Sequence, residues 1–365
     1  MKLADLPTPC LVLDRPTLVR NIHIMGSVLS RLGVPLRPHM KTAKSIDVAR
    51  LVLQGQPGGI TVSTLAEAEY FASHGITDIL YAVGITPSKL DQVAKLNANG
   101  ARVTVITDDP AAADAIAAHP AGIKALIEID CGEQRGGVLV AEDAMMDIAS
   151  RLGSSLMGVM THAGHAYQAR GVREIQEIAE LERSHVVYAA QRLRAAGHTI
   201  SVVSAGSSPT GRHSENMSGL TEFRAGVYMF GDLFQAEIET HPRDSIALSV
   251  LTSVIGRQGG RLLIDAGALA LSKDRSTERS ARDYGFGLVM NVLGERVLGN
   301  TIVQKAYQEH GVVAIDPLSP FDVPIGTRLR VLPNHACLTA AAHDRYHVVD
   351  GNDAVVAVWP RMNGW

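Results

Sequence analysis

The chain has 365 residues, 46% of them hydrophobic and 19% charged, which is the composition of a globular protein long enough to bury a large core. Its formal net charge of −3 provides no general attraction to nucleic acid or to an anionic membrane surface. These values argue against a nucleic-acid-binding or membrane-surface protein and favour one that acts on small molecules.

The N-terminal segment and the cysteines indicate the compartment. The first ten residues, MKLADLPTPC, contain no apolar signal-peptide core, and no later segment is apolar over the length of a membrane span. Cys10, Cys131 and Cys337 are odd in number, far apart and without CxxC spacing, so we expect no disulfide bonds. We therefore expect a soluble cytoplasmic protein.

Short apolar runs alternate with helix-forming segments through the first 226 residues. Such alternation indicates parallel β-α units, and eight units close a (β/α)8 barrel. The eight runs are 34–38, 59–63, 78–82, 102–106, 124–130, 156–162, 200–204 and 221–226. An open doubly wound sheet is the alternative, but no GxGxxG motif follows the first run.

The pattern becomes strand-like after about residue 240, with turn residues between the runs. The strand-like runs are 247–256, 261–267, 327–333, 346–350 and 354–359. We predict an α/β protein with a barrel domain at 12–240 and a β-rich domain at 241–365 that also includes 1–11.

A lysine follows the first predicted barrel strand. The stretch Val34–Lys44, VPLRPHMKTAK, ends the strand in a Pro-His-x-Lys turn, and a helical pattern starts near Ser45. The carboxyl ends of barrel strands form the mouth where such enzymes place their chemistry. We interpret Lys41 as a Schiff-base lysine; a solvated surface charge is the alternative.

Glycine- and hydroxyl-rich loops follow the last two predicted barrel strands, at 204–211 and 225–232. Loops at these positions often bind phosphate, because glycine permits close backbone approach while hydroxyl and N–H groups face the anion. The candidate phosphate-binding residues are Gly206, Ser207, Ser208, Thr210, Gly226, Val227 and Tyr228. The alternative is that both loops are ordinary turns.

Polar residues also follow predicted strands five and six. The loop 131–138 contains Arg135, and the segment 161–167 contains His162, His165 and Tyr167. A single histidine at such a rim is more often structural than catalytic. Together with Lys41, however, these side chains are expected to face one cavity.

His335 and Cys337 lie in the predicted β-rich domain, within PNHACLTAAAHDRYH at 333–347. They are two residues apart, a spacing that on a strand places both side chains on the same face. Imidazole and thiolate together suit zinc, and two protein ligands leave open positions, as in catalytic metal sites. The HxC pattern alone is weak, because most such pairs bind no metal.

Taken together, these motifs resemble the D-serine dehydratase and D-threonine aldolase group of fold type III pyridoxal-phosphate enzymes, whose barrel is like that of alanine racemase. The resemblance covers nearly the whole chain and is greatest to the D-threo-3-hydroxyaspartate dehydratases within the group. The matching motifs include TPCLVLD, RPHMKTAKS, ITVSTLAEAEYF, IEID, THAGHAY, TEFRAGVY, QEHG and PNHACLTAA. The combination of PHxKTxK with PNHxC is the feature of the resemblance that is most specific to this group.

The resemblance implies roles for these residues. Lys41 is expected to bind pyridoxal 5'-phosphate covalently, with His162 against the coenzyme ring, Arg135 at its phenolic oxygen, Tyr167 nearby and the two loops on its phosphate. His335 and Cys337 are expected to bind a divalent metal, zinc before manganese. Arg224 matches the arginine that contacts the pyridine nitrogen in alanine racemases, although members of the group vary there. The resemblance also implies a homodimer.

The activity implied is elimination of water from a D-3-hydroxy amino acid, such as D-threo-3-hydroxyaspartate or D-serine, to a 2-oxo acid and ammonia. His-x-Cys favours a dehydratase, because aldolases of the group tend to show His-x-Asp. The alternatives are retro-aldol cleavage to glycine and an aldehyde and, more remotely, a non-catalytic coenzyme carrier. A β-carboxylate on the substrate needs a cation, for which Lys273, Arg275 and Arg282 are candidates, although a charged loop is usually just solvated.

Overall fold

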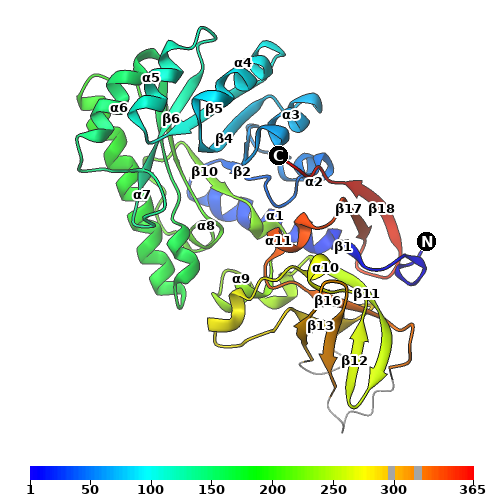
Figure 1. Cartoon of the computed structure of the whole chain (residues 1–365). Helices are drawn as coiled ribbons and strands as arrows, with labels where there is room; N and C mark the ends of the chain where they lie inside the picture. The colour runs from blue at the N-terminus through cyan, green and yellow to red at the C-terminus, as the bar shows by residue number, and fades with distance from the viewer. Residues whose placement is uncertain (295–300, 316–322) are drawn as a thin grey trace. The chain divides into compact units, whose positions relative to one another are not determined.

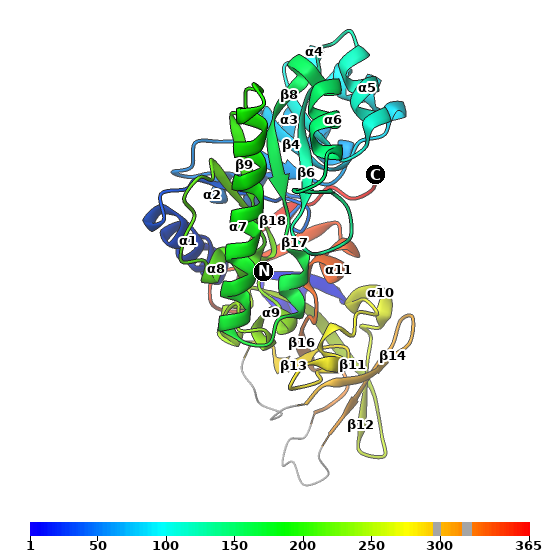
Figure 2. The ribbon, with the colours of Figure 1, turned by 90° about the vertical axis from the view of Figure 1, so that its left-hand side faces the viewer.

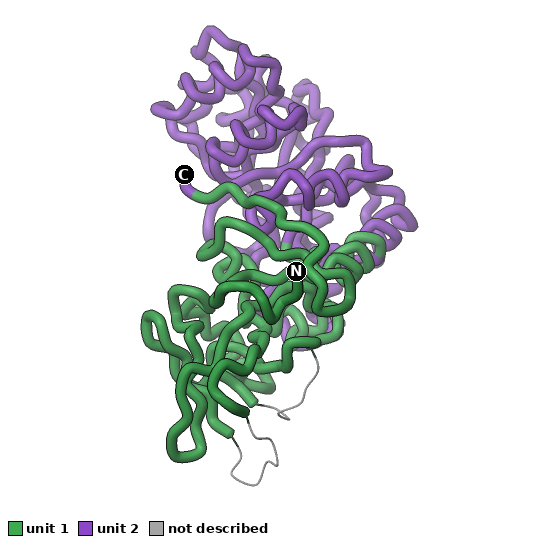
Figure 3. Tube along the Cα trace, turned by 90° about the vertical axis from the view of Figure 1, so that its right-hand side faces the viewer, with its two compact units in different colours: residues 1–23, 227–363 green, residues 24–226, 364–365 purple. Residues whose placement is uncertain are grey.

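The structure is a computed structural model that describes residues 1–294, 301–315 and 323–365 (Figures 1 and 2). The chain forms two compact units (Figure 3). The barrel unit contains residues 24–226 with 364–365, and the sheet unit contains residues 1–23 with 227–363. In the described part of the chain, no helix has both the length and the apolar character needed to cross a membrane.

The described residues of the barrel unit form a nine-stranded parallel sheet, in which eight strands follow the order β2-β10-β9-β8-β6-β5-β4-β3. The two ends of this order meet, because His39 pairs with Thr61 and the Met40 N–H donates to the Thr61 carbonyl at 2.8 Å. The strands are β2 (Leu36–Pro38), β3 (Ile60–Val62), β4 (Asp78–Gly84), β5 (Arg102–Thr107), β6 (Lys124–Asp130), β8 (Leu156–Thr161), β9 (Val202–Ala205) and β10 (Glu222–Ala225), with β7 (Val138–Leu139) beside β6. All eight predicted barrel strands are confirmed.

Helices connect these strands, and Figure 2 shows the long α7 beside β8 and β9, with which it is in contact. Several helices begin at a capping side chain. Thr64 accepts a hydrogen bond from the Glu67 N–H at the start of α3, and Asp109 accepts one from the Ala112 N–H at the start of α5. The helices are α2 (Ile46–Val52), α3 (Leu65–Ser73), α4 (Leu90–Ala98), α5 (Pro110–Ala118), α6 (Ala144–Leu152), α7 (Val172–Ala195) and α8 (Ser208–His213), while α1 (Arg15–Arg31) runs from the sheet unit into the barrel unit.

The described residues of the sheet unit form a mixed nine-stranded sheet in the order β14-β15-β12-β11-β1-β17-β18, with β16 on β11 and β13 on β16. The predicted strands are confirmed as β11 (Leu248–Gln258), β12 (Arg261–Ile264), β16 (Arg328–Leu332), β17 (Arg345–Val349) and β18 (Val355–Pro360). Four further strands were not predicted: β1 (Cys10–Asp14), β13 (Leu288–Asn291), β14 (Val303–Ala306) and β15 (Gly311–Ala314). The short helices α9 (Leu233–Glu237), α10 (Ala268–Leu271) and α11 (Ala336–Ala341) complete the unit.

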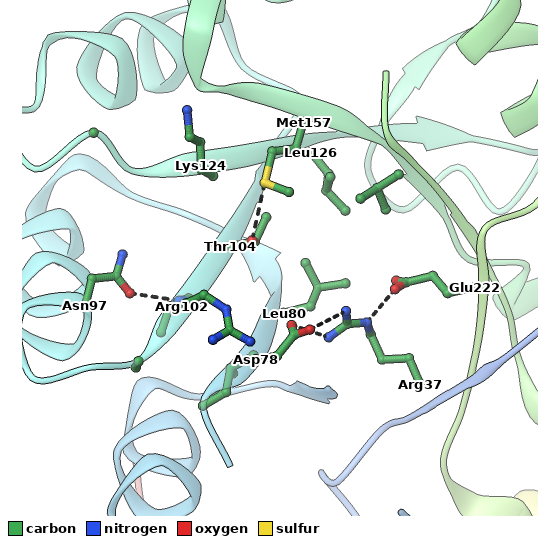
Figure 4. A pocket seen from close by; sticks show the side chains of 15 residues that line it. Arg37, Asp78, Leu80, Asn97, Arg102, Thr104, Lys124, Leu126, Met157 and Glu222 are labelled. Atoms are coloured by element: carbon green, nitrogen blue, oxygen red, sulfur yellow. Dashed lines mark hydrogen bonds and ion pairs between the residues drawn. The ribbon is translucent and has the colours of Figure 1, made fainter. Parts of the chain in front are cut away.

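A cavity of about 450 Å³ opens at the amino ends of the barrel strands (Figure 4). Its wall includes apolar side chains such as Leu80 and Leu126, which belong to the barrel core. At its edge the Arg37 guanidinium donates to Glu222 Oε2 at 2.6 Å and to Asp78 Oδ1 at 2.9 Å. The predicted coenzyme-binding residues follow the carboxyl ends of the strands, so this cavity is not the predicted site.

Substitution of Arg37 tests whether this ion-pair network stabilises the barrel. Arg37→Met removes the direct ion-pair partner of the largely buried Glu222 carboxylate, so we expect the free energy of unfolding to fall by about 3 kcal/mol in urea denaturation. Arg102→Met, which removes an exposed guanidinium from the start of β5, is the matched control and should change it by less than about 0.5 kcal/mol. Equal effects of the two substitutions would contradict a stabilising network.

Candidate active site

Lys41 lies immediately after β2, at the carboxyl end of the barrel, and its side chain is exposed. The motif contains a second lysine, Lys44, whose ammonium group lies 3.0 Å from the buried carboxylate of Glu67. That carboxylate also accepts the Ser63 N–H at 3.1 Å. Lys44 is thus held in a structural ion pair, whereas the Lys41 amine has no ion-pair partner among the described residues. Lys41 is therefore the better nucleophile of the two.

His39 precedes Lys41 by two residues and was missed in the sequence analysis. Its Nε2 lies 3.5 Å from the Ser63 hydroxyl, and its Nδ1 lies 3.4 Å from the Lys41 backbone N–H. Burial lowers the pKa of His39 well below its usual value, and the positive charges of Lys41 and Arg224 lower it further. His39 is therefore a neutral imidazole beside the candidate lysine.

His162 follows β8 and is also neutral. Its Nδ1 donates to the Gly206 carbonyl at 2.7 Å, which leaves Nε2 as the hydrogen-bond acceptor. Burial is the largest cause that lowers the pKa of His162, to about 3, and Lys41, Arg224 and Arg135 also lower it. The ring of Tyr167 is tilted by 49° with its centroid 6.5 Å from that of His162. His162 therefore lies within electrostatic reach of the candidate lysine and both arginines.

Arg135 lies in the exposed loop after β6. Its guanidinium is 3.4 Å from Glu133 and 4.0 Å from Glu128, and 60% of the side chain is exposed. The Glu133 carboxylate lies against Gly164, where an added Cβ would come within 1.8 Å of it. The loops after β6 and β8 are thus packed together, and the Arg135 guanidinium is exposed beside the two carboxylates.

Arg224, on β10, is almost completely buried. Its guanidinium donates to the Ser204 hydroxyl and to the Thr161 carbonyl, both at 2.5 Å. The Ser204 hydroxyl in turn donates to Glu222 at 2.6 Å. Burial lowers the pKa of Arg224, while the carboxylates of Glu222, Glu182 and Glu128 raise it. Arg224 is therefore held inside the barrel by neighbouring strands.

The loop after β9 is built tightly around glycine and hydroxyl groups. Gly206 has a φ of 144°, and an added Cβ would lie 2.0 Å from the Arg224 carbonyl oxygen, so no other residue fits. Ser207 then caps α8 by accepting the Thr210 N–H at 3.2 Å, while its own N–H donates to the Thr210 hydroxyl at 3.1 Å. Ser207, Ser208 and Thr210 are all buried.

Gly226 and the next two residues follow β10. An added Cβ on Gly226 would lie 2.7 Å from the His39 carbonyl oxygen, so this loop approaches the lysine turn closely. The chain passes into the sheet unit between Gly226 and Val227. Burial raises the pKa of Tyr228 far above its usual value, so its phenol stays neutral.

A carboxylate of α7, Glu182, was also missed. Its Oε1 accepts the N–H groups of Ala163 at 2.8 Å and Gly206 at 3.0 Å. Its Oε2 accepts the Thr210 hydroxyl at 2.7 Å. Glu182 thereby links two segments: the turn that contains His162 and the predicted phosphate-binding loop.

The predicted metal ligands, His335 and Cys337, lie in the sheet unit, at the start of a helix rather than on a strand. β16 ends at Leu332, His335 is the N-cap of α11, and Cys337 lies in its first turn. The chain turns into a helix here because the buried Asp232 carboxylate accepts the Ala336 N–H at 2.9 Å. The two side chains still meet, because the His335 imidazole and the Cys337 thiol are hydrogen-bonding neighbours.

The chemistry of this cluster suits a divalent metal. His335 Nδ1 lies 3.6 Å from Asp274 Oδ2, a residue missed in the sequence analysis. Burial lowers the pKa of His335, but Cys337, Asp274 and Asp232 outweigh burial and raise it to about 11. Within the described ranges, no group of three or more His, Cys, Asp or Glu side chains has metal-binding geometry. The cluster therefore offers nitrogen, sulfur and oxygen donors without forming a complete metal shell.

Two family models match the chain. One, described as "Alanine racemase, N-terminal domain", matches residues 13–233, and the other, described as "Putative serine dehydratase domain", matches residues 247–349. The first spans most of the barrel unit and the second lies in the sheet unit.

Several relatives match over nearly the full length, and three of them illustrate the range of activities. The D-threo-3-hydroxyaspartate dehydratase of Delftia sp. (strain HT23) is 42% identical over 100% of this chain and 99% of its own. Its solved structure superposes with a TM-score of 0.96 at 41% identity, and each chain is covered completely. D-serine dehydratase of Dictyostelium discoideum is 30% identical, over 99% of this chain and 98% of its own. 3-Hydroxy-D-aspartate aldolase of Paracoccus denitrificans (strain Pd 1222) is 31% identical, over 99% and 92%.

These full-length similarities agree with the barrel fold. They show that the chain belongs to the D-serine dehydratase and D-threonine aldolase group of fold type III pyridoxal-phosphate enzymes.

Proposed function

We propose that this protein eliminates water from a D-3-hydroxy amino acid, such as D-threo-3-hydroxyaspartate or D-serine, and releases a 2-oxo acid and ammonia. It does so with pyridoxal 5'-phosphate and a divalent metal. The observation that carries the proposal is the exposed Lys41 amine beside neutral His162 at the barrel mouth. The full-length similarity to a D-threo-3-hydroxyaspartate dehydratase supports it.

The barrel residues fit an anionic aldehyde coenzyme, because they combine a free amine, two arginines and a loop of buried hydroxyl groups. When bound, this coenzyme supplies an electron sink for the negative charge that develops at the substrate Cα. We assign Lys41 to covalent attachment and, once its amine is released, to removal of the α-proton. His162 would pack against the coenzyme ring with Tyr167 beside it, and Arg135 and Arg224 would contribute positive charge around the coenzyme.

The phosphate group is assigned to the loops that follow β9 and β10. The contributing residues are Gly206, Ser207, Ser208, Thr210, Gly226, Val227 and Tyr228. Within this proposal the barrel domain spans 12–240, and the β-rich domain at 241–365, with 1–11, holds the metal.

The sheet-unit cluster fits zinc, with manganese as the second choice, because it combines imidazole, thiol and carboxylate groups. The metal supplies Lewis acidity that makes the β-hydroxyl a better leaving group. His335 and Cys337 would hold the metal, and Asp274 would orient the His335 ring through Nδ1.

Retro-aldol cleavage to glycine and an aldehyde is the second candidate, because an aldolase is among the relatives that match over nearly the full length. The thiol at position 337 favours elimination over cleavage, because the aldolases of the group tend to have aspartate there. A non-catalytic coenzyme carrier is a remote alternative, since it leaves the sheet-unit cluster without a use.

The protein is proposed to act as a homodimer in the cytoplasm. Leu269, Tyr307 and Leu338 are large apolar side chains that are about half exposed or more. Leu269 and Leu338 belong to α10 and α11, and the α10 backbone is hydrogen-bonded to the turn that holds Tyr307. Exposed apolar groups on adjacent elements are typical of an interface. The free thiols of all three cysteines suit a reducing compartment.

Lys41→Ala is expected to abolish the near-visible absorption band of the lysine-bound coenzyme and to lower ammonia release by at least about 1,000-fold. Lys44→Ala is the matched control, because Lys44 is held by Glu67; it should keep the band. Absorption and ammonia assays after coenzyme addition make the comparison. A band that survives in Lys41→Ala would place the covalent bond elsewhere.

Metal removal tests the proposed metal ligands, His335 and Cys337, separately from the proposed coenzyme-binding residues of the barrel. Treatment with EDTA, or the double variant His335→Ala with Cys337→Ala, is expected to lower ammonia release at least about 100-fold while the coenzyme band stays. Added zinc should restore the treated wild-type protein but not the variant. Undiminished ammonia release after EDTA would remove the metal from the proposal.

A substrate panel tests both the reaction and the β-substituent. We expect ammonia, not glycine, from D-threo-3-hydroxyaspartate and D-serine; glycine with an aldehyde would instead identify an aldolase. Arg275 is paired with Asp283, and Arg282 stacks on Tyr284, so Lys273 is the candidate for a β-carboxylate. Lys273→Met should lower kcat/KM about tenfold for the hydroxyaspartate and leave D-serine unchanged.

A further inference from the structure

We propose that Glu182 is a positioning residue for the coenzyme: it holds the His162 turn and the phosphate-binding loop in one fixed arrangement. The proposal rests on the proposed function of the barrel site. Glu182 itself contacts neither the coenzyme nor the substrate. It acts through the two loops that are proposed to contact the coenzyme.

Glu182 is 1% exposed and lies on the face of α7 that packs against β8 and β9. A carboxylate can only accept hydrogen bonds, and all three of its partners are donors: two backbone N–H groups and the Thr210 hydroxyl. A carboxylate at this position therefore satisfies all three donors. Ala163 and Gly206 both lie beyond the ends of their strands, so no neighbouring strand supplies an acceptor for their N–H groups.

A carboxylate that is buried between a helix and a sheet costs free energy, because the charged group loses its hydration. Burial raises the pKa of Glu182, and its hydrogen bonds and Arg224 only partly oppose that cost. An apolar residue of similar size would pack here without the cost but would leave two buried N–H groups unsatisfied. The carboxylate thus serves to fix the loops rather than to pack the helix.

The contacts transmit this constraint to both halves of the site. Gly206 is held on both sides, because its N–H donates to Glu182 and its carbonyl accepts from His162 Nδ1 at 2.7 Å. The Thr210 hydroxyl donates to Glu182, and its oxygen accepts the Ser207 N–H. The orientation of the His162 ring and the shape of the phosphate-binding loop therefore depend on the same carboxylate.

The test measures coenzyme binding rather than activity. Glu182→Leu is expected to raise the coenzyme Kd at least about tenfold and to shift the ³¹P resonance of the bound phosphate, because two loop N–H groups lose their acceptor. Glu182→Gln should stay within about threefold of wild type, because the amide oxygen can accept both N–H groups while its NH₂ faces Thr210. Glu182→Asp keeps the charge but shortens the reach, so we expect a rise of about fivefold.

Val186→Ala is the matched control, because Val186 is a fully buried residue one turn further along α7. It should lower the melting temperature without changing the coenzyme Kd or the ³¹P shift. If Glu182→Leu does not fold, Glu182→Asp carries the test. Wild-type affinity in the folded Leu or Asp variant, or an equal loss in Val186→Ala, overturns the role of Glu182 alone. Failure of the wild-type protein to bind the coenzyme overturns both this role and the proposed function.

Discussion

Closure of the parallel barrel between β2 and β3 is the constraint on which the site depends. Parallel strands end at the same edge of their sheet, so closure brings the segments after β2, β6, β8, β9 and β10 around one mouth. The last ladder bond, from Met40 to Thr61, comes one residue before Lys41. The amine is thus placed by sheet geometry, and Gly226 permits the β10 loop to approach the same turn.

Charge is arranged differently at the two ends of this barrel. At the amino ends, Arg37 is neutralised by Asp78 and Glu222, which suits a stabilising role. At the carboxyl ends, Lys41 and Arg135 are exposed, whereas the imidazoles of His39 and His162 are neutral because burial and the nearby cations lower their pKa values. Such an arrangement suits the anionic coenzyme and substrate that are proposed for this site, and it leaves both histidines uncharged.

Each unit contributes one kind of chemistry. The barrel unit holds the Lys41 amine and the candidate anion-binding groups, and the sheet unit holds the imidazole, thiol and carboxylate groups that suit a metal. The proposed elimination draws on both kinds, because the Cα proton and the β-hydroxyl are activated by different means. The two family models follow the same division along the chain.

The sequence by itself determined the eight barrel strands and the lysine turn, because apolar periodicity and turn residues act over a few neighbouring positions. It did not show β13, β14 and β15, although strands as short as β2 and β3 were predicted. These three are identified as strands by their antiparallel pairing with β16, β15 and β12. The helix at His335 depends on Asp232, 104 positions before Ala336. Glu182 lies in a segment rich in charged residues, and only packing distinguishes it from its solvated neighbours. Its partners are 19 to 28 positions away, and contacts at such separations are decided by tertiary structure.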